Sequence, residues 1–322
     1  MPIHASLADY QAPIWLLGAH LQTIWGARVI STPQPVYQRE WLPTKDGQDH
    51  LACDFVFSTQ QDAPLVIMFH GLEGSSQSHY AKALMTKIKK NQMNGLILHF
   101  RGCGGIPLSG KRAYHAGDSE EISWVLQQFS TRFKKIYACG VSLGGNMLAK
   151  YLGEQQQKAL CQAAVVVSAP LNMVAASEPL SKGWGKWLYT RDFLSTLKPK
   201  AYNLWQNHPE LFDWQQVSKA TSFNEFDSAF TAVLHGYKDA MDYWQQTSAF
   251  PLLKNIRIPT LVLNAQNDPF IPAYSLPKET DVSSQVMLMQ PEYGGHVGFV
   301  SGTFPGHVYW LAETILDFFE QF

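Results

Sequence analysis

Cysteine is scarce in this sequence of 322 residues, which contains 4 of them and no CxxC pair. Because Cys53, Cys103, Cys139 and Cys161 stand far apart, the pattern argues against a redox motif or a cysteine-based metal site. A chain of this size also needs no disulfide framework. Cys139 and Cys161 lie in or beside apolar runs, so we expect them to be small residues of the core.

An excess of charge of either sign is also missing, since 25 basic and 26 acidic residues give a formal net charge of −1. No Lys/Arg-rich stretch suggests a nucleic-acid partner. No set of His, Cys, Asp and Glu residues has the spacing of metal ligands. We therefore predict that the protein uses neither a metal ion nor another cofactor.

The start of the chain lacks the features of a targeting segment. The residues from Met1 to His4 include no Lys or Arg, and the longest early apolar run, residues 14–17, is too short for a signal-peptide core or a membrane span. We expect a cytoplasmic protein with no stable membrane anchor. Whether it is a monomer or a small homo-oligomer stays open.

What the sequence does contain is a repeated succession of short apolar runs and helical patterns. Hydrophobic residues make up 46% of the chain, enough for one large domain with a sizeable insertion. Runs that are apolar at nearly every position indicate parallel strands covered on both faces. The predicted strands are residues 65–69, 96–100, 136–139, 164–167, 261–264 and 286–289, and the predicted helices are residues 78–90, 145–152 and 308–319.

Two further regions complete the predicted architecture. Residues 37–42 and 51–57 flank the turn signal Thr44-Lys45-Asp46-Gly47, which predicts an antiparallel hairpin at the start of the sheet. Residues 171–250 show no strand pattern but hold half of the tryptophans, which we expect mainly in that region's own core. We predict an α/β fold with a core domain of residues 1–170 and 251–322 and a helical cap of residues 171–250. Such a cap would cover the carboxyl ends of the strands, where open α/β sheets bind ligands.

The strongest chemical signal is the pentapeptide Gly140-Val141-Ser142-Leu143-Gly144. A predicted strand runs into this GxSxG motif and a helix leaves it, as a nucleophile elbow requires. The turn is so tight that only small residues fit around the serine. We therefore predict that Ser142 is a nucleophile.

A serine hydroxyl becomes a good nucleophile when a base removes its proton. His296 follows the last predicted strand and has glycines beside it, whereas His307 stands at the start of the closing helix, where capping is the simpler role. Asp268 follows the strand before that and would orient the imidazole. The order Ser142, Asp268, His296 is the order in which this type of fold carries its triad.

An oxyanion hole needs two backbone N–H groups. We expect one from Leu143, after the nucleophile, and the other from Leu72 in the loop His70-Gly71-Leu72-Glu73-Gly74. His70 is expected to brace that loop rather than act as a second base. Arg101 is expected to tie neighbouring loops together, and Cys103 has no elbow or partner base that would make it a nucleophile.

Six short motifs along the chain together resemble those of a known protein family. They are residues 18–23 (GAHLQT), 70–76 (HGLEGSS), 100–105 (FRGCGG), 114–118 (YHAGD), 140–146 (GVSLGGN) and 223–227 (FNEFD). With these the chain resembles the α/β-hydrolase superfamily, and within it the YheT-like esterase subfamily that is related to the eukaryotic ABHD lipases. The resemblance implies a triad on Ser142, Asp268 and His296, and hydrolysis of short-chain or lipid-like carboxylic esters.

We therefore expect a serine hydrolase that cleaves a small-molecule ester through an acyl-enzyme intermediate. Two alternatives stay open. An acyltransferase would use the same triad but pass the acyl group to an alcohol or thiol, and a ligand-binding protein could use a hydrolase scaffold without catalysis.

Overall fold

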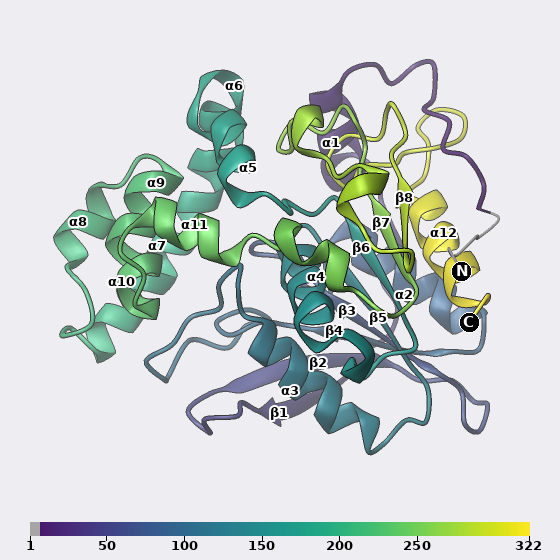
Figure 1. The fold of residues 1–322 in the computed structure, drawn as a ribbon, viewed down its shortest axis with the longest axis horizontal. Helices are drawn as coiled ribbons and strands as arrows, with labels where there is room; N and C mark the ends of the chain where they lie inside the picture. The colour runs from purple at the N-terminus through teal and green to yellow at the C-terminus, as the bar shows by residue number, and fades with distance from the viewer. Residues whose placement is uncertain (1–6) are drawn as a thin grey trace.

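The computed structural model describes residues 7–322, so the stretch from Met1 to His4 lies outside the described residues. Its centre is one eight-stranded sheet with the strand order β1-β2-β4-β3-β5-β6-β7-β8 (Figure 1). β1 pairs antiparallel with β2, β2 pairs antiparallel with β4, and the remaining pairs are parallel. The strands are β1 (Gln38–Pro43), β2 (His50–Val56), β3 (Leu65–Phe69), β4 (Asn94–Leu98), β5 (Ile136–Val141), β6 (Ala163–Val167), β7 (Thr260–Leu263) and β8 (Val286–Met289).

Each apolar run of the sequence forms a strand, and the predicted antiparallel hairpin is confirmed. β4 differs most from its prediction, because it begins and ends two residues earlier than residues 96–100. The last two predicted residues, His99 and Phe100, lie beyond the end of β4. The backbone N–H of His99 still donates to the carbonyl oxygen of Ala52 in β2 (2.9 Å), whereas that of Phe100 donates to Nε2 of His70 (3.2 Å).

Helices cover both faces of the sheet, as uniformly apolar strands require. Successive strand residues face opposite sides, so Leu65 and Ile67 pack into one buried cluster while Val66 and Met68 pack into another. The first cluster includes residues of α3 (Ser119–Ser130) and α4 (Leu143–Gln155). The second includes residues of α2 (His79–Lys90) and α12 (Tyr309–Phe319).

Between β6 and β7 the chain forms a helical insertion, and no strand occurs in this part of the described residues. The insertion projects to one side of the sheet layers in Figure 1. Its helices are α5 (Met173–Ser181), α6 (Gly183–Gly185), α7 (Arg191–Asn207), α8 (Trp214–Lys219), α9 (Phe223–Phe226), α10 (Ala232–His235) and α11 (Ala240–Thr247), with π-helical turns at η2 (Lys186–Thr190) and η3 (Asp227–Thr231).

The insertion has its own buried cluster, which includes Leu204, Val217 and Phe230. The expectation for its tryptophans holds for Trp205 and Trp214, whose rings stack with centroids 6.4 Å apart beside that cluster. It does not hold for all of them, because Trp187 is 61% exposed and Trp244 lines a pocket.

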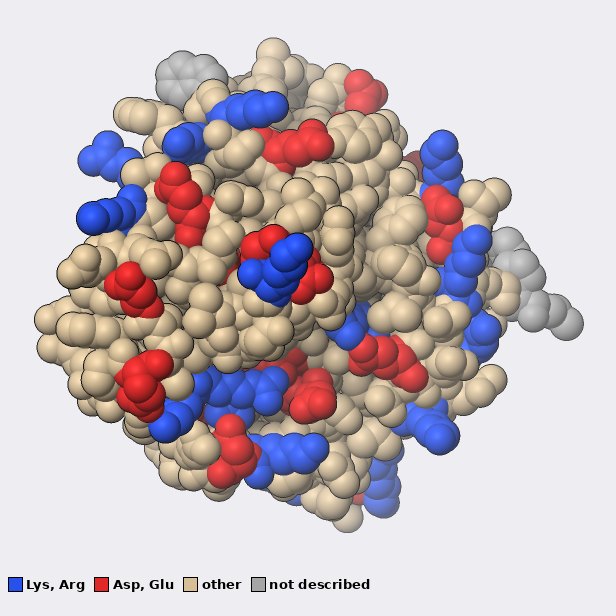
Figure 2. All heavy atoms as spheres, turned by 60° about the vertical axis from the view of Figure 1, so that its left-hand side comes forward, with Lys and Arg blue, Asp and Glu red and all other residues tan. Residues whose placement is uncertain are grey.

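The remaining elements are short or lie outside the sheet. α1 (Ala19–Arg28) was not predicted from the sequence, and the 3-10 helices are Gln156–Lys158, Phe250–Asn255, Ala273–Ser275 and Glu279–Asp281. Among residues 7–322, no helix is both long and apolar enough to cross a membrane. Acidic and basic side chains are mixed over the face shown in Figure 2.

Candidate active site

Ser142 lies in a sharp turn between the end of β5 and the start of α4. Its φ of 52° is a conformation that costs a non-glycine residue about 1–3 kcal/mol. The turn needs glycine on both sides because a Cβ at Gly140 would lie 2.5 Å from the carbonyl oxygen of Gly144, and one at Gly144 would lie 2.4 Å from that of Phe69. The strand–turn–helix context predicted for the GxSxG motif is therefore present.

Three predicted site residues form one chain of hydrogen bonds. Nε2 of His296 lies 2.9 Å from Oγ of Ser142, and Nδ1 of His296 lies 2.8 Å from Oδ2 of Asp268. The Asp268 side chain is fully buried and that of His296 is 11% exposed. Because a carboxylate only accepts hydrogen bonds, Nδ1 carries the proton and Nε2 is free to accept one from the serine hydroxyl.

The alternative histidine takes a different role. His307 forms an isolated bridge with Ser301, in which each backbone N–H donates to the other residue's carbonyl at 2.9 Å. The imidazole Nδ1 of His307 accepts from the backbone N–H of Tyr309 at the start of α12 (3.4 Å).

Helix α1 braces the loop that carries His296, which we call the histidine loop (residues 294–298). The backbone N–H of His296 donates to Oγ1 of Thr23 (2.9 Å), and the N–H of Gly294 donates to Oε1 of Gln22 (3.0 Å). The same Gln22 oxygen accepts from the side-chain amide of Asn267 (2.9 Å), next to Asp268. Gln22 and Thr23 are buried, so α1 holds the loops of both Asp268 and His296 in place.

The loop of residues 70–74, which we call the HGLEG loop, lies against the serine. A Cβ at Gly71 would be 3.0 Å from Cβ of Ser142. Within residues 7–322, neither the Leu72 nor the Leu143 N–H donates to a protein acceptor. Both residues line the same pocket as Ser142.

His70 braces the HGLEG loop, as the sequence suggested. Its Nδ1 lies 2.7 Å from the carbonyl oxygen of Gly71, and its Nε2 accepts from Phe100. Burial lowers the pKa of His70 to about 3, against the effect of the bond to Gly71. The ring is thus neutral at pH 7, with its proton on Nδ1.

Arg101 ties neighbouring segments together in the way expected of it. Its guanidinium donates to Glu121 (2.7 Å), Asp46 (3.0 Å) and Asp49 (3.2 Å). Burial and the nearby Asp118 nevertheless raise the pKa of Glu121 to about 7, against the effect of Arg101.

Among residues 7–322, no group of three or more His, Cys, Asp or Glu side chains is arranged to hold a metal ion.

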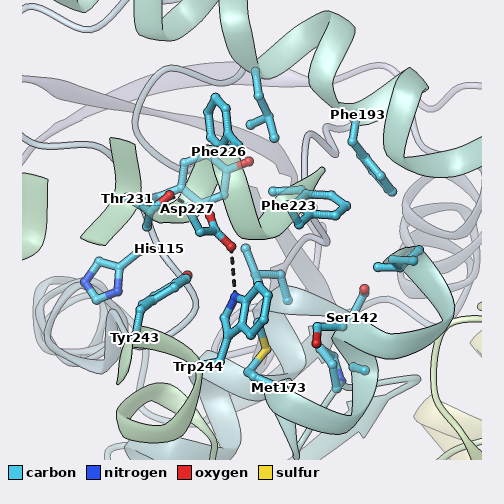
Figure 3. A pocket seen from close by; sticks show the side chains of 18 of the residues that line it. His115, Ser142, Met173, Phe193, Phe223, Phe226, Asp227, Thr231, Tyr243 and Trp244 are labelled. Atoms are coloured by element: carbon cyan, nitrogen blue, oxygen red, sulfur yellow. Dashed lines mark hydrogen bonds between the residues drawn. The ribbon is translucent and has the colours of Figure 1, made fainter. Parts of the chain in front are cut away.

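A pocket with about 1130 Å³ of empty space, part of it open to solvent, extends from Ser142 beneath the helical insertion. Its wall is mainly apolar, and Phe193, Phe223 and Phe226 project into the space in Figure 3. Asp227 is a polar exception, since its carboxylate accepts from the indole N–H of Trp244 (2.9 Å) and from the hydroxyl of Thr231 (2.7 Å).

Sequence reasoning missed several residues that shape this site. The motif GAHLQT (residues 18–23) contains Gln22 and Thr23, but its sequence does not indicate that these two side chains reach the histidine loop. The ring of Phe270, two residues after Asp268, lies 4.2 Å from that of His296 between centroids. Lys200 of the insertion also lines the pocket, and no motif marked it.

Comparisons with known proteins fit this geometry. The model of a protein family described as alpha/beta hydrolase fold matches residues 64–303. The chain belongs to the α/β-hydrolase fold family. This hydrolase is 39% identical to "Putative esterase YheT" of Escherichia coli over 88% of this chain and 84% of that one. It is 30% identical to the phospholipase ABHD3 of Homo sapiens, over 96% of this chain and 78% of the other.

A solved structure supports the fold of this hydrolase. The esterase Pf2001 of Pyrococcus furiosus superposes with a TM-score of 0.56, at 14% identity and over 99% of each chain. The predicted family and fold class are therefore confirmed, and relatives named as an esterase and a phospholipase support an enzyme of the ester-hydrolase type.

Proposed function

We propose that this protein is a serine hydrolase that cleaves carboxylic esters with Ser142 as nucleophile, His296 as base and Asp268 as the residue that orients the imidazole. The observation that carries this proposal is the continuous hydrogen-bond chain from Asp268 through His296 to Ser142. A buried carboxylate keeps the imidazole in the tautomer that accepts the serine proton, and stabilises the imidazolium that results.

The reaction proceeds by two acyl transfers. His296 takes the proton of Ser142 while Oγ attacks the ester carbonyl, and the N–H groups of Leu72 and Leu143 stabilise the oxyanion. His296 then gives the proton to the leaving alcohol, which leaves an acyl group on Ser142. A water molecule that gives a proton to the same imidazole attacks this acyl-enzyme and releases the acid.

The helical insertion serves as the cap of this site. On this reading residues 171–250 form a cap domain over the core of residues 1–170 and 251–322. The cap supplies most of the phenylalanine side chains around the pocket, a surface suited to an apolar acyl chain. The relatives named as an esterase and a phospholipase are consistent with short-chain or lipid-like esters as substrates.

The test combines fluorophosphonate labelling with a series of p-nitrophenyl esters of increasing acyl length, for the wild type and Ser142→Ala. We expect the labelling of the variant to vanish and its turnover to fall by ~10⁴- to 10⁶-fold, because the triad acts as a unit. Ser195→Ala, which changes an exposed serine of α7, is the matched control and should behave as the wild type. Unchanged turnover in Ser142→Ala would refute the proposal.

The same assay separates hydrolysis from acyl transfer. The acyltransferase alternative uses the same triad, so an alcohol acceptor is added and the new ester is measured beside the free acid. Free acid as the main product supports the esterase. No labelling and no turnover in folded wild-type protein would favour the ligand-binding alternative instead.

A further inference from the structure

The side chain of Glu73, one residue beyond Leu72, is held from two sides. The Tyr114 hydroxyl donates to Oε1 of Glu73 (2.9 Å) and accepts from the Glu73 backbone N–H (3.0 Å). The ammonium group of Lys200 donates to the same carboxylate oxygen (2.7 Å). Tyr114 belongs to the core, whereas Lys200 comes from α7 of the helical insertion. The ion pair of Glu73 with Lys200 thus joins the HGLEG loop to the insertion.

The backbone at Glu73 has a conformation that needs support. The N–H of Gly74 donates to the carbonyl oxygen of Gly71 (3.0 Å), which closes a four-residue turn with Leu72 and Glu73 in its middle. Glu73 has a φ of 56° at the third position, where such turns favour glycine or asparagine. A residue in this region persists only where its surroundings hold it. The hydrogen bonds from Tyr114 and Lys200 to the Glu73 side chain stabilise this backbone conformation.

The ion pair of Lys200 and Glu73 is partly shielded from water. The Glu73 side chain is 10% exposed and that of Lys200 is 30% exposed. Burial alone would lower the pKa of Lys200, but Cys103 and Glu73 outweigh it and raise the pKa. The Cys103 thiol lies 3.3 Å from the ammonium nitrogen, and burial raises its pKa to about 11. Cys103 is therefore a neutral thiol at pH 7 that accepts a hydrogen bond from Lys200, and the ion pair of Lys200 is the one with Glu73.

We propose that Lys200 is a positioning residue for the oxyanion hole. Through its ion pair with Glu73 it fixes the turn that aims the Leu72 amide at the reacting carbonyl. This inference rests on the proposed function. Because a catalytic group must be held within about 0.5 Å of its productive position, the oxyanion hole is complete only when α7 of the insertion is docked. The cap thus contributes to the chemical step as well as to the pocket wall.

The central variants are Lys200→Met, which removes the charge and keeps much of the length, and Glu73→Gln, which removes the opposite charge. Lys200→Arg retains the ion pair and should restore activity to within about threefold of the wild type. We expect kcat of Lys200→Met and Glu73→Gln to fall by about tenfold with little change in KM. That is less than the ~10²–10³-fold cost of losing an oxyanion donor outright.

Two control variants separate positioning from other effects. Lys198→Met changes the same helix, but Lys198 donates to the carbonyl oxygen of Ser218 within the insertion (2.7 Å). Lys111→Met breaks a different ion pair between core and insertion, that of Lys111 with Glu210 (2.9 Å). Both should keep wild-type kcat. A trifluoromethyl ketone, which forms an oxyanion on the serine, should lose affinity in step with kcat for Lys200→Met, whereas affinity for the product acid should not change.

Ser142→Ala, assayed in parallel, distinguishes the two proposals. Loss of turnover in Ser142→Ala together with a wild-type kcat and ketone affinity in Lys200→Met overturns the positioning role and leaves the proposed function intact. An equal loss in Lys111→Met and Lys200→Met also overturns it, because docking of the insertion alone would then explain both. Retained turnover in Ser142→Ala overturns both proposals.

Discussion

The two loops that flank Ser142 are held by different parts of the molecule. Uncharged hydrogen bonds fix the histidine loop, whose backbone N–H groups donate to the buried side chains of Gln22 and Thr23 in α1. The HGLEG loop is fixed at Glu73 by a tyrosine of the core and by an ion pair from the helical insertion. The insertion reaches the histidine loop less directly, because Tyr189 bonds to His20 of α1 (3.0 Å) and packs against Phe270 (centroids 4.5 Å apart). On our proposals the stabilisation of the oxyanion thus depends more directly on the insertion than the position of the base does. Mutations can test whether this division is real.

The largest effect is expected at the end of the triad, on the histidine-loop side. Asp268→Asn keeps the shape of the side chain, but its amide can stabilise the wrong imidazole tautomer. We expect kcat to fall by ~10⁴-fold, measured with the best ester of the series. Asp268 is not among the residues that line the pocket, so KM should change little. A loss below tenfold would mean that Asp268 does not orient His296.

A smaller effect is expected where α1 meets the histidine loop. Thr23→Val removes the acceptor of the His296 backbone N–H and leaves that buried group unpaired, at a cost of about 1–3 kcal/mol. If that cost appears as displacement of the loop, kcat should fall by about 10- to 100-fold. Thr23→Ser, which keeps the hydroxyl, is the matched control.

Combining Thr23→Val with Lys200→Met tests the division between the loops directly. Two loops held independently should give effects on kcat that multiply. A coupling free energy well above 1 kcal/mol would show that the two loops are not held independently.

The smallest effect concerns the insertion away from both loops. Burial raises the pKa of Asp227 to about 6, above the ordinary value near 3.9. The folded state therefore holds this proton more tightly than the unfolded chain, so the contribution of Asp227 to stability is lost as pH rises from about 4 through 6. Asp227→Asn should raise Tm by a few degrees at pH 8 and by little at pH 4.5. The asparagine can still accept from Trp244 and donate to Thr231.

Thermal unfolding from pH 4.5 to 8 would check that expectation. A constant difference in Tm between Asp227→Asn and the wild type across this range would contradict it. The activity of the variant should also retain its sensitivity to Lys200→Met, because Asp227 has no hydrogen bond to the HGLEG loop.

Much of the fold could be predicted because apolar runs and helical periodicity are local features of the sequence. β3 (Leu65–Phe69) and β8 (Val286–Met289) begin and end where the apolar runs do. Helix α2 begins directly after Ser78, although the Ser78 side chain makes no capping bond to it and instead accepts from the N–H of Ser75. The predicted end of β4 was wrong by two residues. Phe100 is apolar enough to continue the strand, but its backbone N–H donates to the side chain of His70 in the HGLEG loop.

Neighbouring residues in the sequence are enough to predict the chemistry that they create. Glycine at 140 and 144 beside Ser142 predicts the elbow, and the chain order of Ser142, Asp268 and His296 predicts which side chains could meet. How those side chains are held in place depends on contacts between distant parts of the chain. Thr23 lies 273 positions from His296, and Lys200 lies 127 positions from Glu73. Contacts at such separations leave no local periodicity or spacing, because they arise only when the sheet brings α1 and the helical insertion to the same edge.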